Sequence, residues 1–328
     1  MVPLISDNKN TGANAANMAI ALTHHCQMNC RYCGISSKSF DMRQETLYKS
    51  IDILFSAQHN DIELQFFGGE PLIRFDLINK AVSYSREKAE NTKKEITFLL
   101  TTNGLLLNRK ILDYFRALRA TVLLSLDGAP AAHLKSRPLK NKNGPHAYES
   151  IMHALRGLQE RKMDFFINLV YTEKNLKILF DNVSFLAANG IKKIKLSYAV
   201  GSKFKESDAC AVYGTLEEIF HAFPALEFPG SCGENEPILA TPQITVDSTG
   251  MVYRGCALVL EKKYPGFNRL MRVGPVKDAP DYKSLQRTAA QQTEFLLERK
   301  REIPAVLLDN LRFGQTLKEL LSARRMRT

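Results

Sequence analysis

One short stretch of the sequence, LTHHCQMNCRYCGIS (residues 22–36), gathers three cysteines: Cys26, Cys30 and Cys33. Cysteine binds metals as a thiolate, and iron–sulfur clusters are held by such thiolates. Three thiolates fill three of the four iron positions of a cubane cluster and leave one iron open to a small molecule. A zinc site completed by His24 or His25 is the alternative. The spacing therefore predicts a metal centre and leaves the metal undecided.

Composition limits the class of protein. The chain has 328 residues, 45% of them apolar, which is enough for a full hydrophobic core. Residues 1–17 lack the apolar run of a signal peptide, and no stretch approaches the roughly 18 apolar residues that a membrane span needs. We therefore expect a cytoplasmic protein without a membrane partner, whose six cysteines serve metal or redox chemistry rather than disulfides.

The chain is basic, with a formal net charge of +11. Clusters at residues 269–272, 298–302 and 323–328 are suited to attracting an acidic peptide or a nucleic acid by long-range steering. A solvated, lysine-rich surface explains the same excess, because no Lys/Arg block is interleaved with aromatic residues. We expect no nucleic-acid partner on this basis.

Apolar runs alternate with amphipathic stretches along the first two thirds of the chain. The strand candidates are residues 18–23, 62–67, 96–102, 121–126, 165–171 and 191–198. The helix candidates between them include residues 43–58, 109–120, 147–162 and 175–190, which carry apolar residues near a 3.6-residue period. Such alternation predicts an α/β fold with a parallel sheet, in which loops after the strand ends build the active site.

The pattern changes after about residue 205. Residues 228–237 are rich in turn formers, residues 244–254 read as a hairpin, and residues 283–325 read as helical with a break at Pro304. We expect two domains, a core over residues 1–205 and a smaller α+β extension over residues 206–328.

Further landmarks follow the cysteines in a fixed order. They are Tyr32 directly before the third cysteine, GGEP (68–71), TTNG (101–104), SLDG (125–128), HLKSR (133–137) and INLVYTEKN (167–175). With the C-x3-C-x2-C spacing, this order resembles the radical S-adenosylmethionine (SAM) enzymes over about residues 18–200. The resemblance implies a partial (β/α)6 barrel with the cysteine loop after the first strand, a 4Fe–4S cluster and bound SAM.

Each landmark has a physical reading of its own. Gly68 and Gly69 let the backbone approach a ligand closely, and Glu70 is able to accept from an ammonium group. A plain strand-to-helix turn is the alternative for these three residues. Tyr32 offers a π-face for adenine, against ordinary packing. Arg137 is the expected partner of a carboxylate, although an exposed arginine is the common case.

Short polar side chains end two of the later strand candidates. Asn103, Ser125 and Asp127 are suited to binding the carboxylate or ribose hydroxyls of SAM. Residues of these types at strand ends also serve as helix caps. They complete the expected cofactor-binding set, for which the sequence identifies no catalytic residue.

The C-terminal region resembles the SPASM and twitch extensions of radical SAM enzymes, in which cysteines hold auxiliary clusters. Only Cys210, Cys232 and Cys256 lie outside the first motif, so we expect at most one further iron–sulfur cluster. Cys232 and Cys256 are its main candidates, and Cys210 is a candidate third ligand.

The resemblance implies reductive cleavage of SAM to a 5′-deoxyadenosyl radical, which abstracts hydrogen from a substrate. The leading hypothesis is a ribosomally made peptide or protein substrate, modified by crosslinking, epimerisation or oxidation, with flavodoxin or ferredoxin as electron donor. A small metabolite in cofactor or antibiotic biosynthesis is the second hypothesis. A zinc-bound nucleic-acid-binding module is the third.

Overall fold

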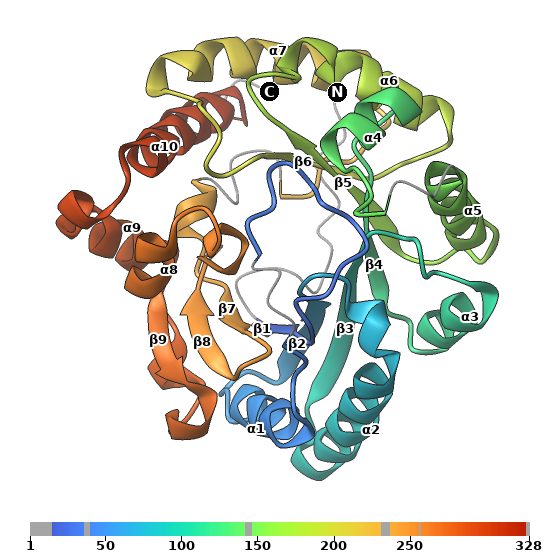
Figure 1. Cartoon of the computed structure of the whole chain (residues 1–328), viewed down its shortest axis with the longest axis vertical. Helices are drawn as coiled ribbons and strands as arrows, with labels where there is room; N and C mark the ends of the chain where they lie inside the picture. Colours follow the sequence, from blue (N-terminus) through green and yellow to red (C-terminus); the bar gives the residue numbers. More distant parts are fainter. Residues whose placement is uncertain (1–14, 36–39, 142–145, 231–236, 256, 326–328) are drawn as a thin grey trace.

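The computed structural model of the chain describes residues 15–35, 40–141, 146–230, 237–255 and 257–325 (Figure 1). Its strands are β1 (Ala16–Ala21), β2 (Asp61–Phe67), β3 (Glu95–Thr102), β4 (Thr121–Ser125), β5 (Phe165–Tyr171), β6 (Ile194–Tyr198), β7 (Ile244–Val246), β8 (Met251–Arg254) and β9 (Arg272–Pro275). All nine belong to one sheet in the order β6-β5-β4-β3-β2-β1-β7-β8-β9. The first six strands pair in parallel, β7 joins β1 in parallel, and β8 and β9 are antiparallel.

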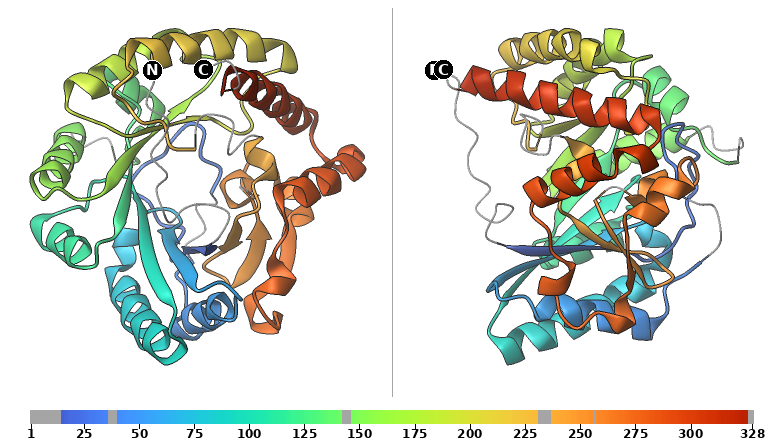
Figure 2. Two further views of the ribbon diagram at one scale, coloured as in Figure 1. Left: turned by 180° about the vertical axis from the view of Figure 1, so that it is seen from behind. Right: turned by 90° about the vertical axis from the view of Figure 1, so that its left-hand side faces the viewer.

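Six helices follow the six parallel strands or lie between them. They are α1 (Gln44–Phe55), α2 (Phe75–Thr92), α3 (Arg109–Ala117), α4 (Pro130–Ser136), α5 (Ala147–Glu160) and α6 (Leu179–Ala188). In α5 the buried residues Ile151, Leu155 and Leu158 recur at the helical period, so one face of the helix packs on the sheet. Figures 1 and 2 show these helices around the outside of a curved sheet. The predicted α/β fold, a partial barrel with a C-terminal extension, is confirmed.

The C-terminal extension continues the sheet and adds α7 (Ala209–Ala222), α8 (Pro265–Leu270), α9 (Ala289–Glu298) and α10 (Ala305–Arg325). The hairpin expected over residues 244–254 is formed by β7 and β8. The edge strand β9 was not expected. Its first residue belongs to RLMR (269–272), which was read from the sequence as a basic cluster and not as part of a strand. No helix in the described ranges is long and apolar enough to cross a membrane.

Helix α10 lies beside α7 in both views of Figure 2. An aromatic cluster and the buried side-chain amide of Asn310 hold α10 against the barrel. Phe313 stacks on Phe204 with ring centroids 4.8 Å apart. The Asn310 Oδ1 accepts from the Gly201 backbone N–H at 2.7 Å, and its Nδ2 donates to the Ser202 carbonyl oxygen at 2.9 Å. Asn310 thus satisfies backbone groups of the loop that follows β6.

We expect Asn310→Ala to lower the free energy of unfolding by about 3 kcal/mol, because buried backbone groups lose their partners. Urea titration followed by circular dichroism measures the change. Glu319→Ala, at an exposed position of the same helix, is the matched control. Equal effects of the two substitutions would contradict the role assigned to Asn310.

Candidate functional site

A cavity of about 910 Å³ runs through the interior of the barrel. It is lined by inward-facing side chains of β2 to β6, by β1 and the segment before β7, and by the loop that follows β1. We call residues 22–35 of that loop the cysteine loop. Nine of the predicted cluster-binding and cofactor-binding residues line this cavity: Cys26, Cys30, Tyr32, Cys33, Gly68, Gly69, Asn103, Ser125 and Arg137.

The turn after β2 holds the cysteine loop by backbone hydrogen bonds. The Gly69 N–H donates to the Thr23 carbonyl oxygen at 2.9 Å, and the Glu70 N–H donates to the His25 carbonyl oxygen at 2.8 Å. A Cβ atom on Gly69 would lie 2.2 Å from that His25 oxygen. Gly68 has φ +123°, a conformation that other residues rarely adopt. The absence of side chains at the two glycines therefore allows the cysteine loop to contact the turn after β2 through its backbone.

Glu70 is fully buried and does not line the cavity. Its fully buried carboxylate accepts from the Thr102 hydroxyl at 2.8 Å and from the Asn103 N–H at 2.7 Å. Burial raises the pKa of Glu70 to about 7, although these hydrogen bonds oppose the shift. Because Glu70 does not line the cavity, we expect it to position the turns after β2 and β3 rather than to bind a ligand.

The three cysteines lie on one loop and face the cavity. Cys26 and Cys30 are half-buried and Cys33 is exposed. The Cys26 sulfur accepts from the Met28 N–H at 3.4 Å and from the Asn103 Nδ2 at 3.6 Å. Burial raises the pKa of Cys26, and it raises that of Cys30 to about 12. Iron binding at these sulfurs would therefore displace protons.

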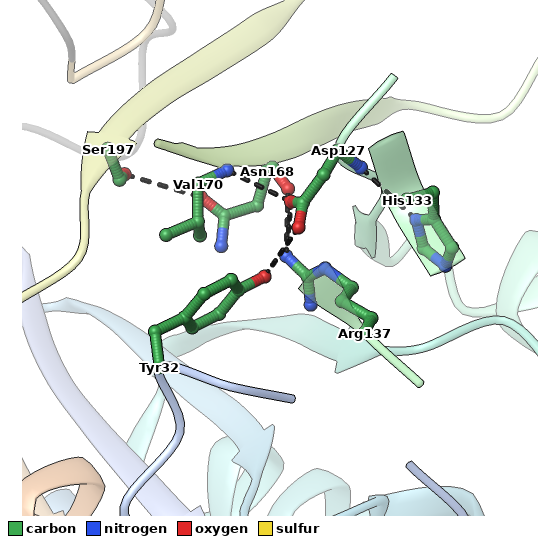
Figure 3. A network of polar contacts seen from close by, with 7 residues as sticks. All are labelled: Tyr32, Asp127, His133, Arg137, Asn168, Val170 and Ser197. Carbon is green, nitrogen blue, oxygen red and sulfur yellow. Dashed lines mark hydrogen bonds and ion pairs between the residues drawn. The ribbon is translucent and has the colours of Figure 1, made fainter. Parts of the chain in front are cut away.

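A buried carboxylate organises the far side of the cysteine loop (Figure 3). Asp127 accepts from the Arg137 guanidinium at 2.9 Å, from the Tyr32 hydroxyl at 2.8 Å and from the Val170 N–H at 3.0 Å. The His133 ring nitrogen Nδ1 accepts from the Asp127 N–H at 3.3 Å. This network ties the cysteine loop to β4, α4 and β5.

The network changes the roles read from the sequence. Arg137 was expected to meet the carboxylate of a ligand, but its carboxylate partner here is Asp127. Burial by itself lowers the pKa of Arg137, yet Asp127 and Tyr32 raise it above its ordinary value, so the group stays charged. The Tyr32 ring lies 5.3 Å from the guanidinium carbon. Asp127 itself does not line the cavity.

Part of the C-terminal extension also contacts the cysteine loop. The Gly34 N–H donates to the Val259 carbonyl oxygen at 2.8 Å, and the Lys262 N–H donates to the Gly34 carbonyl oxygen at 2.6 Å. Lys263 Nζ donates to the Arg31 carbonyl oxygen at 2.9 Å. The loop is therefore held by three supports: the turn after β2, the Asp127 network and residues 259–263.

The remaining cysteines are less informative. Cys232 and Cys256 lie outside the described residues. Cys210 is exposed on α7 and does not line the cavity. The second cluster stays a prediction.

Sequence reasoning missed the polar side chains inside the barrel. Glu63, Gln65, Asn168 and Gln243 all line the cavity. Their signal was present in the strand DIELQFF, where polar residues alternate with apolar ones. A strand that is buried against apolar residues on both faces reads as a continuous apolar run, so this alternation indicates that one face of the strand lines a polar interior.

We expect Asp127→Ala to lower the free energy of unfolding by about 3–5 kcal/mol, because it leaves the buried Arg137 guanidinium unpaired. Denaturant titration measures the loss. Asp113→Ala, which breaks the exposed pair with Arg161, is the control and should change stability far less. A loss no larger than that of the control would show that the buried pair does not stabilise the loop.

Comparison with known proteins identifies the family. Residues 20–177 match the radical SAM superfamily. An uncharacterized protein of Methanocaldococcus jannaschii is 35% identical over 206 residues, which cover 62% of this chain and 68% of that protein. A cysteine-type anaerobic sulfatase-maturating enzyme of Clostridium novyi is 27% identical over 169 residues, which cover 48% of this chain but only 44% of the enzyme.

The fold has a close counterpart among solved structures. That of anSMEcpe with bound AdoMet superimposes with a TM-score of 0.75 at 18% identity, covering 96% of this chain and 98% of that one. The same protein with bound AdoMet and the Kp18Cys peptide gives a TM-score of 0.73 at 18% identity, with 95% and 98% covered. By its sequence and its fold, the chain belongs to the radical SAM superfamily.

Proposed function

We propose that this radical SAM enzyme holds a 4Fe–4S cluster on Cys26, Cys30 and Cys33 and modifies a peptide or protein substrate in the barrel cavity. The observation that carries the proposal is that all three cysteines face a cavity of about 910 Å³. When bound, the cluster and SAM supply the one-electron chemistry that removes a hydrogen atom from a substrate.

The residues present fit these two cofactors. Three thiols on one loop match three irons of a cubane and leave one iron for the ligand. Gly68 and Gly69 line the cavity wall without side chains, so a ligand with an amino acid moiety can approach the backbone there. Asn103 and Ser125 contribute neutral polar side chains to the same wall.

The protein's own task is to orient the cofactors and to exclude water. The turn after β2 holds the cysteine loop by backbone hydrogen bonds, and Asp127 holds it through the Tyr32 hydroxyl. Tyr32 and Arg137 present a ring and a stacked cation to the cavity, which form a flat apolar and cationic surface beside Cys30 and Cys33. This surface suits an adenine ring.

A peptide or protein substrate is supported by two of the similar proteins. A sulfatase-maturating enzyme shares sequence with this chain, and a protein of similar fold binds a peptide together with AdoMet. A one-electron donor such as flavodoxin or ferredoxin, and an auxiliary cluster on Cys232, Cys256 and Cys210, belong to the same proposal.

Replacing Cys26, Cys30 and Cys33 together with Ala should remove about four irons per chain and abolish SAM cleavage in the anaerobically purified protein. Iron analysis and chromatography of 5′-deoxyadenosine measure the two losses. Any iron that remains in the variant reports an auxiliary cluster. Gly214→Ala, whose added Cβ would meet no atom within 4 Å, is the control for the loss of SAM cleavage. A folded, colourless wild-type protein that contains zinc would refute the proposal.

Gly69→Ala should lower both iron content and SAM affinity about tenfold or more, because its Cβ would displace the backbone of the cysteine loop. Gly214→Ala on α7 is the matched control, since no atom lies within 4 Å of the added Cβ. Equilibrium dialysis with labelled SAM measures the affinity. Unchanged binding in Gly69→Ala would mean that the close approach of the two segments is not needed for the site.

A further inference from the structure

The carboxylate of Glu63 faces the barrel cavity far from the cysteine loop. Glu63 lies five residues before Gly68 on β2 and lines the cavity together with Asn17, its neighbour on β1. Five residues of extended strand span roughly 17 Å, so Glu63 marks the opposite end of the cavity from the turn that holds the cysteine loop. The cavity therefore has two chemically different ends.

Several of the other polar side chains in this part of the cavity are paired. Gln65 accepts from the Gln243 amide at 2.6 Å and donates to the Thr101 hydroxyl at 2.8 Å. Lys193 pairs with Asp164 at 2.9 Å, and Lys195 also has a partner. Two carboxylates of the cavity lining, those of Glu63 and Glu227, have no hydrogen bond or ion pair with any residue of the described ranges. Of the two, Glu63 is the one on a strand of the barrel wall.

This isolation is costly for a carboxylate. Burial alone raises the pKa of Glu63 to about 7, and no charged side chain of the described ranges contributes to the shift. Glu63 is half-buried. An ionised group partly removed from water and without a partner is unfavourable, whereas a charge-assisted hydrogen bond to a cation offsets that cost. A neutral donor compensates less, because hydrogen bonds between neutral groups are roughly half as strong.

We propose that Glu63 binds a cationic nitrogen of the substrate at this end of the cavity, while the reacting atom lies at the cysteine end. The inference rests on the proposed function and adds a substrate class to it: an elongated molecule with an ammonium or guanidinium group remote from the site of hydrogen abstraction. The side chain of a lysine or arginine within a peptide has this chemistry, and so does a small aliphatic amine.

Matched probes test the charge requirement in the SAM-bound holoenzyme. The first pair is a blocked hexapeptide of glycine and serine with one central lysine, and the same peptide with norleucine. The second pair is 1-aminopentane and 1-pentanol. Isothermal titration calorimetry should show that wild-type protein binds the cationic member of a pair about tenfold or more tightly, and that Glu63→Gln removes this preference.

Asp61→Asn, which alters an exposed carboxylate on the same strand, is the control and should retain the preference. Preference for the lysine peptide identifies a peptide cation, and preference for 1-aminopentane alone identifies a small amine. No preference in wild-type protein, or a preference that persists in Glu63→Gln, overturns the inference. Iron content and SAM cleavage, measured on the same samples, report separately on the proposed function.

Discussion

The backbone contact between the turn after β2 and the cysteine loop is the constraint on which the site depends. Two hydrogen bonds, from Gly69 to Thr23 and from Glu70 to His25, bring the loop down onto the end of the sheet. The contact is possible only because Gly69 has no Cβ, which would otherwise lie 2.2 Å from a carbonyl oxygen. Glu70 then uses its buried carboxylate to bind the start of the next loop, so one four-residue motif sets the relative positions of three strand ends.

A second set of contacts, centred on Asp127, completes the support. Its carboxylate accepts from a tyrosine of the cysteine loop, an arginine beyond α4 and a backbone N–H of β5. All of these groups are buried or nearly so, and each hydrogen bond is therefore stronger than it would be in water. The arrangement separates the residues that support the site, Glu70 and Asp127, from those that face the cavity, such as Asn103 and Arg137. A reaction that depends on precisely positioned cofactors needs such supporting residues behind the residues that contact the cofactors.

Strand β2 contributes residues to both ends of the cavity. Along β2 the side chains at positions 63, 65 and 67 point inward, and the strand ends in the glycines that hold the cysteine loop. The turn thus positions the cofactor end, while Glu63 gives the other end a charge preference. A single register of β2 against β1 and β3 fixes both, because a shift by one residue would turn Glu63 and Gln65 outward.

The sequence by itself determined the alternation of strands and helices, the cysteine motif and the family, because these are encoded by local periodicity and by spacing within one loop. Tertiary structure alone decided the roles of Asp127 and Arg137, which pair with each other although each was read as facing a ligand. It also revealed the buried polar interior, since only the curvature of the sheet shows which face of DIELQFF is enclosed. Partners such as Tyr32 and Asp127 are 95 residues apart, and no local pattern specifies contacts at that distance.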